Sequence, residues 1–253
     1  MDSSARERRQ SAVVLIPALN EQETIGPIVT AALAVPEIKQ VVVVDNGSRD
    51  ETAARASQAG ATVVEHRERG KGQAVRGGLG YICASPLKEG LDTIVLLDAD
   101  LRELHERHFR ALIEPMLDKE IDMVCGVLWK PSVFRVLGKA PVHVLTGQRA
   151  IRFDALRSVD LSRCNGYELE ATLNCAIDPK RTTKVSLSGV KHVRREDKLY
   201  SDWAPTPSLP TYITGPWTRL RMLASYAELL AKSHRLPKIQ GGDSKAATDA
   251  RFN

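Results

Sequence analysis

The chain of 253 residues has few aromatic side chains and no long hydrophobic run. Aromatic residues make up 5% of the sequence and are not interleaved with basic residues, so we expect no nucleic-acid partner that binds by base stacking. No apolar stretch approaches the length of about 20 residues that spans a bilayer. The charged segment 1–10 also lacks the apolar core of a secretory signal. These absences predict a cytoplasmic protein.

Cysteine pairs and glycine-rich nucleotide motifs are missing as well. The four cysteines show neither CxxC pairing nor the spacing of a disulfide framework, which disfavours a zinc site and predicts buried, reduced thiols: Cys83, Cys125, Cys164 and Cys175. Neither GxGxxG nor the Walker A pattern occurs, so the fingerprints of the dinucleotide-binding fold and of P-loop proteins are absent.

The chain has the composition of an ordinary globular protein and a net positive charge. Hydrophobic residues make up 43% and charged residues 26% of the sequence, which is enough to bury the core of one large domain. The net charge of +5 favours anionic partners such as phosphorylated small molecules.

Strands and helices alternate in the first half of the chain. Short apolar runs predict strands at 12–16, 40–44, 61–65, 93–97 and 123–127. Helices are predicted between them at 21–33, 50–58, 72–83 and 106–117. Continuous apolar strands separated by helices predict an α/β fold, with a mostly parallel central sheet covered by helices on both faces.

The alternation stops near residue 128. A strand is expected within 146–153, then a helix at 166–177 and a strand at 183–187. Four prolines make 203–216 an extended linker before an amphipathic helix at 218–233. We therefore divide the chain into disordered termini at 1–11 and 241–253, one domain at 12–202 with halves 12–128 and 129–202, and a linker with a C-terminal helix at 203–240.

Asp98-Ala99-Asp100 directly follows the strand predicted at 93–97. Ligands of open α/β sheets bind at the carboxyl ends of the strands. Two carboxylates clustered there repel each other unless a cation lies between them, and a hard divalent ion shared with substrate phosphates would supply it. A solvated turn or a helix cap is the alternative.

Two earlier strands also end in polar clusters. Asn20 and Asp50 are placed to cap the helices that follow them, whereas Asp45 can accept hydrogen bonds from a ribose or a base. Further on, Gly70-Lys71-Gly72 opens a helix, and a lysine beside a helix N-terminus suits a diphosphate. A flexible basic loop is the alternative there.

Together, four segments resemble the family 2 glycosyltransferases with the GT-A fold. They are VVLIPALNEQETIGPIVT at 13–30, VVVVDNGSRDETA at 41–53, RGKGQAVRGGL at 69–79 and IVLLDADL at 94–101. The resemblance covers most of 12–200 and is closest to polyprenyl- or dolichyl-phosphate sugar transferases and to glucosyl-3-phosphoglycerate synthases. It implies a Rossmann-like nucleotide-sugar half at 12–128 and an acceptor half at 129–202.

The resemblance implies a donor site for a UDP- or GDP-sugar. The residues that would bind the nucleotide sugar are Pro17, Ala18, Asn20, Glu21, Asp45, Gly70, Lys71, Asp98 and Ala99. Lys71 would steady the phosphates. Asp98 and Asp100 would form the DxD pair, in which Asp100 is the direct ligand of Mg²⁺ or Mn²⁺ and counts as catalytic.

The same resemblance places acceptor residues in the second half. Gln148 and Arg149 lie in the strand that would contact the acceptor. Glu168 and Glu170 open the next helix two residues apart, so they do not share a helical face. One of them would act as general base on an acceptor hydroxyl, and the sequence leaves open which one.

An acceptor phosphate needs cations rather than a base, and the basic run 191–198 would supply them. The resemblance assigns Arg194 to catalysis, and Arg195 and Lys198 to acceptor binding. His192 lies where some relatives carry a metal-binding histidine, although a solvated charged surface is the alternative. The segment 191–202 lacks the Gly-Ser loop expected of lipid-phosphate mannosyltransferases.

These expectations predict metal-dependent transfer of a hexose to a phosphate-bearing acceptor, above all polyprenyl phosphate. The alternatives are 3-phosphoglycerate as acceptor and, in another class, a nucleotide-sugar-binding protein without catalysis. A nucleotidyltransferase would carry a glycine-rich loop at 17–24, and a receiver domain would be about half as long. The helix at 218–233 would contact the main domain, a second copy in a homodimer, or a membrane surface.

Overall fold

In the computed structural model the central element is a seven-stranded sheet. The structure describes residues 10–68, 70–128, 146–162, 164 and 168–193, so the predicted linker, C-terminal helix and tail lie outside the described residues. The strands of this sheet are β1 (Ala12–Ala18), β2 (Ile38–Asp45), β3 (Thr62–Glu65), β4 (Thr93–Leu96), β6 (Met123–Val127), β7 (Arg149–Arg152) and β8 (Thr182–Ser186).

The strand order is β3-β2-β1-β4-β7-β6-β8. Strand β7 runs antiparallel to β4 and β6, and the other neighbours are parallel. The predicted mostly parallel sheet is therefore confirmed.

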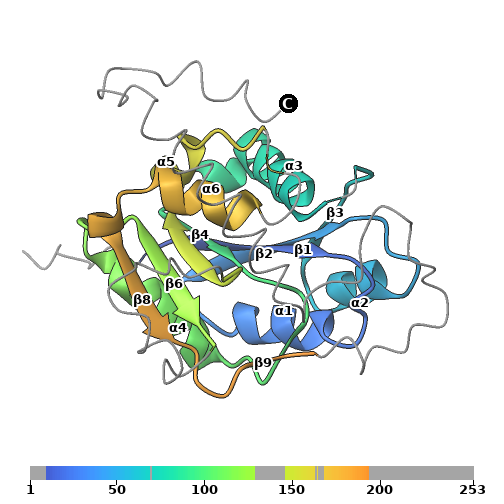
Figure 1. Ribbon diagram of the computed structural model, residues 1–253. Helices are drawn as coiled ribbons and strands as arrows, with labels where there is room; N and C mark the ends of the chain where they lie inside the picture. Colours follow the sequence, from blue (N-terminus) through green and yellow to red (C-terminus); the bar gives the residue numbers. More distant parts are fainter. Residues whose placement is uncertain (1–9, 69, 129–145, 163, 165–167, 194–253) are drawn as a thin grey trace, which may run out of the picture.

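Two layers of helices cover the sheet (Figure 1). One layer consists of α3 (Lys71–Ala84), α5 (Phe153–Arg157) and α6 (Glu168–Ala176), and the other of α1 (Ile25–Leu33), α2 (Thr52–Gln58) and α4 (Glu106–Ile113). Short 3-10 turns follow or connect them at Pro86–Lys88, Glu114–Leu117 and Pro179–Arg181. Among the described residues, no helix combines the length and apolar character needed to cross a membrane.

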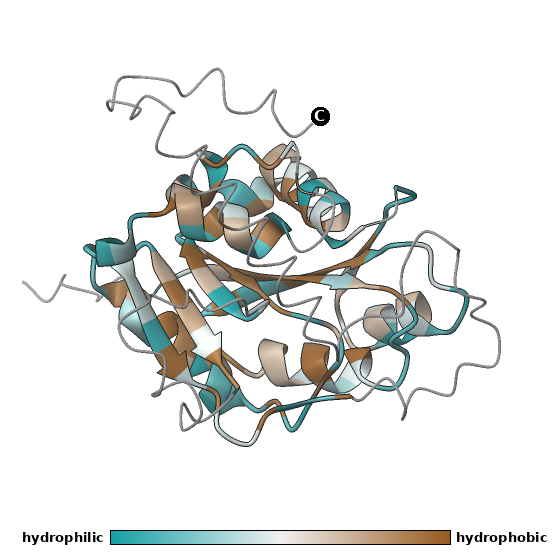
Figure 2. Ribbon diagram, in the orientation of Figure 1, coloured by the Kyte–Doolittle hydropathy of each residue, from teal (hydrophilic) through white to brown (hydrophobic). Residues whose placement is uncertain are grey.

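The core is split into two apolar layers by the sheet. Val14 and Ile16 of β1 pack in the layer of α1 and α4, whereas Val13 and Leu15 pack in the layer of α3, α5 and α6. Because successive side chains of a strand point to opposite faces, a strand covered on both sides must be apolar throughout. Figure 2 shows this as hydrophobic colour along the central strands.

Helix α1 begins four residues later than predicted. Asn20 has a positive φ of 55°, and the helix follows Thr24, so the interpretation of Asn20 as an N-cap is wrong. Asn20 Oδ1 instead accepts a hydrogen bond from the N–H of Arg49 at 2.9 Å. The interpretation of Asp50 as an N-cap is also wrong, because the N-cap of α2 is Glu51, but Asp50 Oδ1 does accept from the N–H of Thr52, the first residue of the helix, at 3.0 Å.

Two other boundaries differ from prediction. The α-helical part of the segment 106–117 ends at Ile113, and a 3-10 turn follows because Pro115 lacks an N–H for the α-helical pattern. At the chain's start, Gln10 and Ser11 belong to the folded part rather than to a disordered terminus. Gln10 is buried, and the N–H of Ser11 donates to Asp92.

Neither helix α5 nor a second, two-stranded sheet was predicted from the sequence. In this small sheet β5 (Leu101–Arg102) pairs antiparallel with β9 (Lys191–His192), and Leu101 lies opposite His192. Strands of two residues carry no periodic pattern that could predict them. Their effect is to bring residue 192 next to the segment 98–100.

An ion-pair cluster fastens β6, β7 and β8 near the start of β6. Asp122 Oδ1 lies 3.2 Å from Arg152 Nε, and its Oδ2 lies 2.5 Å from Arg181 Nε. The hydrogen bond from Arg181, together with the charges of both arginines, lowers the pKa of Asp122. A lowered pKa means that this carboxylate stabilises the fold above its ordinary value of 3.8 and loses that contribution as the pH falls through the folded value.

We therefore expect Asp122→Asn to lower the free energy of unfolding at pH 7 by about 1–3 kcal/mol, because two arginines lose a charged partner. The difference from the unchanged protein should shrink below pH 3.8. Urea unfolding across pH tests this, with Asp154→Asn at an exposed position of α5 as the control. Equal stability of the two variants at pH 7 would contradict the assignment.

Candidate active site

The carboxyl ends of β1, β2 and β4 meet at one edge of the sheet. Pro17 and Ala18 end β1, Asp45 ends β2, and Asp98 follows β4. Because these strands are parallel neighbours, the predicted nucleotide-sugar residues come together at this edge. The loops there are interlocked, since the N–H groups of Asn20 and Glu21 donate to the hydroxyls of Ser48 and Thr52.

Asp98 is held on both oxygens by side chains from other elements. Lys71 Nζ, at the start of α3, lies 2.6 Å from Oδ1, and Gln148 Nε2 donates to Oδ2 at 2.7 Å. Gly147 lies directly against this carboxylate, so that a Cβ there would stand 2.3 Å from either oxygen. The first acid of the DxD pair is thus fixed in place.

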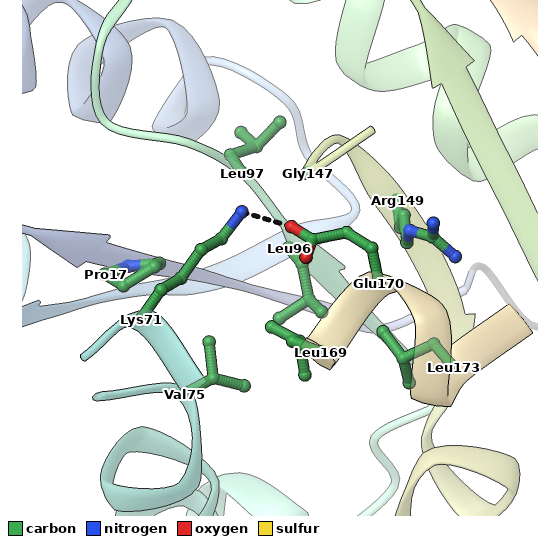
Figure 3. A pocket seen from close by; sticks show the side chains of 10 residues that line it. All are labelled: Pro17, Lys71, Val75, Leu96, Leu97, Gly147, Arg149, Leu169, Glu170 and Leu173. Atoms are coloured by element: carbon green, nitrogen blue, oxygen red, sulfur yellow. Dashed lines mark hydrogen bonds and ion pairs between the residues drawn. The ribbon is translucent and has the colours of Figure 1, made fainter. Parts of the chain in front are cut away.

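Lys71 also joins α3 to α6 through Glu170, whose Oε1 lies 2.5 Å from Nζ (Figure 3). Burial acts to lower the pKa of Lys71, but the charges of Asp98 and Glu170 outweigh it and raise the pKa above its ordinary 10.5. Lys71 is therefore a permanent cation at the centre of the site.

Asp98, Asp100 and His192 form a cluster that fits a metal ion. One ligand atom from each lies within 4.8 Å of the others, and His192 Nδ1 is 3.1 Å from Asp100 Oδ1. The pairing of β5 with β9 and the hydrogen bond from the N–H of Val193 to the carbonyl of Asp100 place the histidine there. Two carboxylates and one imidazole suit Mn²⁺, and carboxylates suit Mg²⁺.

His192 is thus a neighbour of the DxD pair rather than part of an isolated charged surface. The hydrogen bond to Asp100, with the charge of that carboxylate, raises the pKa of His192. The histidine side chain is 50% exposed, which leaves it accessible to a ligand from solvent.

The structure distinguishes the two acids of α6. Glu168 is exposed, whereas the side chain of Glu170 is only 6% exposed and faces Lys71. Glu170 Oε2 is buried and has no hydrogen-bond partner among the described residues. A buried oxygen without a donor costs about 1–3 kcal/mol, so Glu170 is ready to accept a hydrogen bond from a ligand.

Two predicted acceptor residues turn out to be internal. Gln148 is 1% exposed and binds Asp98, and Arg149 is fully buried, with Nη1 2.7 Å from Asn174 Oδ1. Figure 3 shows the guanidinium of Arg149 directed away from the pair of Lys71 and Glu170. Both side chains lie inside the fold because β7 is in the sheet between β4 and β6, and acceptor binding by these two residues stays a prediction.

The remaining predicted cations, Arg194, Arg195 and Lys198, lie outside the described residues. A small pocket opens beside the Lys71–Glu170 pair. Its lining is mostly apolar and consists of Pro17, Lys71, Val75, Leu96, Leu97, Gly147, Arg149, Leu169, Glu170 and Leu173 (Figure 3).

Sequence reasoning missed two residues that shape the site. Asn46 Nδ2 donates to the carbonyls of His66 and Glu68, and its Oδ1 accepts from the N–H of Gly70 at 2.9 Å. This amide therefore holds the loop that leads into Lys71. Its position next to Asp45, at a strand end, was the signal that could have found it.

Thr24 is the second missed residue. Its hydroxyl is buried and donates to the carbonyl of Ala99, in the middle of the DxD segment, at 2.6 Å. The residue before α1 thus fixes the main chain between the two acids, a contact over 75 positions that no local pattern reveals.

Comparison with solved structures identifies the fold. The glucosyl-3-phosphoglycerate synthase from Mycobacterium tuberculosis, in complex with Mn²⁺, uridine-diphosphate-glucose and phosphoglyceric acid, aligns with a TM-score of 0.63 at 22% identity. The alignment covers 94% of this chain and 84% of that chain. The protein therefore has an α/β fold of the GT-A type, as the sequence predicted.

Sequence comparison then gives the family. The model for "Glycosyl transferase family 2" matches residues 13–164, and the chain belongs to this family. An uncharacterized glycosyltransferase of M. tuberculosis is 31% identical over 198 residues, which is 70% of this chain and 84% of the relative. Undecaprenyl-phosphate mannosyltransferase of Micrococcus luteus is 29% identical over 221 residues, covering 74% and 86%.

Proposed function

We propose that this protein transfers a hexose from a UDP- or GDP-sugar to a phosphate-bearing acceptor, above all polyprenyl phosphate, with Mg²⁺ or Mn²⁺. The observation that carries the proposal is the cluster of Asp98, Asp100 and His192 beside Lys71. The family supports glycosyl transfer, and the named relatives support the acceptor class: one acts on undecaprenyl phosphate, and the other was solved with Mn²⁺, a UDP-sugar and phosphoglyceric acid.

On this proposal, different residues at the carboxyl edge of the sheet bind the nucleoside and the diphosphate of the donor. Residues from Pro17 to Glu21, with Asp45, hold the nucleoside. Gly70 and Lys71, at the N-terminus of α3, hold the diphosphate, where the charge of the lysine and the positive end of the helix stabilise negative charge. Bound to the DxD acids and His192, the metal would neutralise charge on the diphosphate as it departs.

Glu170 has a defined task if the acceptor attacks through a hydroxyl. Its Oε2 would take the hydroxyl proton while the acceptor oxygen forms a bond to the anomeric carbon and the bond to the diphosphate oxygen breaks. If the acceptor attacks through a phosphate oxygen, no proton moves. Arg194, Arg195 and Lys198 would then neutralise the acceptor charge.

The test of the donor site is a thermal-shift panel of UDP, GDP and their sugars with Mn²⁺. We expect one nucleotide to raise the melting temperature by several degrees, since a ligand at about 100 times its Kd stabilises by about 2.7 kcal/mol. Asp100→Ala should abolish this gain. Equally tight, metal-independent binding by Asp100→Ala would rule out the metal role.

Product analysis with polyprenyl phosphate and with 3-phosphoglycerate then identifies the acceptor. Formation of a glycosylated 3-phosphoglycerate would replace the lipid acceptor in the proposal. Binding without transfer to either acceptor, and without hydrolysis of the donor, would favour a non-catalytic binding protein. The cytoplasmic location stays a prediction. The homodimer and the peripheral membrane contact also stay predictions, because the segment 218–233 that would make these contacts lies outside the described residues.

A further inference from the structure

We infer that Thr146 and Gln148 form a buried relay that orients Asp98 and thereby sets the affinity of the site for a divalent cation. The inference rests on the proposed function, because it concerns the same metal site. It turns Gln148 from a predicted acceptor contact into a positioning residue.

The relay is built from hydrogen bonds that fix the side-chain amide at both ends. Gln148 Nε2 donates to Asp98 Oδ2 at 2.7 Å, and its Oε1 lies 2.5 Å from the hydroxyl of Thr146. The same hydroxyl lies 2.8 Å from the carbonyl of Gly126 in β6, and the N–H of Gly126 donates to the Gln148 carbonyl at 2.8 Å. The amide is thus anchored to the sheet.

The charge of Asp98 dictates which end of the amide faces it. An NH₂ group donates to a carboxylate, whereas an amide oxygen in that position would repel it. The Thr146 hydroxyl favours this orientation because its one proton lies between two acceptors, the amide oxygen and the carbonyl of Gly126. Lys71 on Oδ1 and Gln148 on Oδ2 favour one orientation of Asp98, and each oxygen keeps a lone pair for a ligand.

Groups that orient metal ligands in this way are worth about tenfold to hundredfold in metal affinity. A buried glutamine can also serve packing alone, and the chain contains a matched case. Gln10 is 8% exposed, donates from Nε2 to the carbonyl of Met116, and accepts at Oε1 from the hydroxyl of Thr93. Both glutamines accept from a threonine hydroxyl and donate from Nε2, but the acceptor of Gln10 is a main-chain carbonyl, whereas the acceptor of Gln148 is the carboxylate of Asp98.

The experiment compares Gln148→Met with Gln10→Met. Each variant replaces a buried amide with an apolar side chain of similar size, and each should lower the melting temperature. Mn²⁺ is titrated into each protein, and the fraction of free Mn²⁺ is followed by electron paramagnetic resonance. The titration is done without nucleotide and again in the presence of UDP or GDP. We expect Gln148→Met to bind Mn²⁺ about tenfold to hundredfold more weakly, and Gln10→Met to bind it like the unchanged protein.

A second pair covers the case in which Gln148→Met does not fold. Thr146→Val removes the hydroxyl with little change of shape, and Thr146→Ser keeps it. Weaker Mn²⁺ binding by Thr146→Val that Thr146→Ser restores would support the relay.

Three results would overturn the inference. They are unchanged Mn²⁺ affinity in folded Gln148→Met, equal losses in the two glutamine variants, and equal Mn²⁺ affinity in the two threonine variants. If the unchanged protein binds no Mn²⁺ under any of these conditions, the proposed function fails and the inference falls with it. If it does bind and the variants match it, the inference alone fails.

Discussion

Lys71→Met should lower kcat/KM by about 10²–10³, the loss typical of removing one group that stabilises developing negative charge. The physical reason lies in its two partners. Lys71 Nζ pairs with Asp98 at 2.6 Å and with Glu170 at 2.5 Å, and the side chains of all three are less than a third exposed. Without the cation, two carboxylates face each other, and the diphosphate loses the lysine at the start of α3.

The variant should also be less stable, because breaking a buried pair leaves a charge without a partner. This difference should be constant between pH 6 and 10. The raised pKa of Lys71 means that its contribution is complete below the ordinary value of 10.5 and is lost only above it. Urea unfolding at several pH values measures the stability, and steady-state kinetics, with the donor and acceptor that the binding and product assays select, measure the effect on kcat/KM.

Lys88→Met is the matched control, because Lys88 is exposed in the 3-10 turn after α3. It should leave stability and kinetics unchanged. If Lys71→Met kept the kcat/KM of the control, Lys71 would be a structural ion-pair partner and not part of the donor site.

The sequence predicted the sheet and the strand-end positions well, because both follow from local patterns. Apolar runs mark strands that are covered on both faces, and polar residues directly after them must gather at the carboxyl edge. Asp45, Lys71 and Asp98 therefore lie at the predicted edge. Where local chemistry decided a boundary, as at Pro115 after α4, the pattern of apolar residues alone was misleading.

Contacts between distant segments could not be read in the same way. His192 lies 92 positions after Asp100 and reaches it through the pairing of two short strands, and only the resemblance to a family suggested this contact. The burial of Gln148 and Arg149 depends on β7 entering the sheet between β4 and β6, and that strand order leaves no trace in the residues themselves. Thr24 and Asn46 likewise act on main chain that is remote in sequence.

Gly147→Ala should move the Asp98 carboxylate without removing any charge from the site. A Cβ at this position would lie 2.3 Å from both oxygens of Asp98, far inside van der Waals contact. The backbone of Gly147 is not in the left-handed region, so alanine is conformationally allowed and even reduces the entropy of the unfolded chain. The clash is relieved when the short Asp98 side chain swings away from Lys71 and Gln148. This movement breaks both contacts of Asp98, so we expect the melting temperature to fall, but by less than in Lys71→Met, because Lys71 keeps its pair with Glu170.

The variant should bind the metal and the donor less well and should transfer more slowly. Displacing a positioned group by about 1 Å can cost about a hundredfold, so we expect kcat/KM to fall by about that factor and the Mn²⁺-dependent gain in melting temperature to disappear. Gly26→Ala in α1 is the control, because a Cβ there meets its nearest heavy atom, the carbonyl oxygen of Arg55, only at 4.0 Å. A Gly147→Ala protein with the kinetics of this control would show that Asp98 need not lie where Lys71 and Gln148 hold it. Loss of activity at a temperature well below the melting temperature of the variant would tie the position of Asp98 to the reaction.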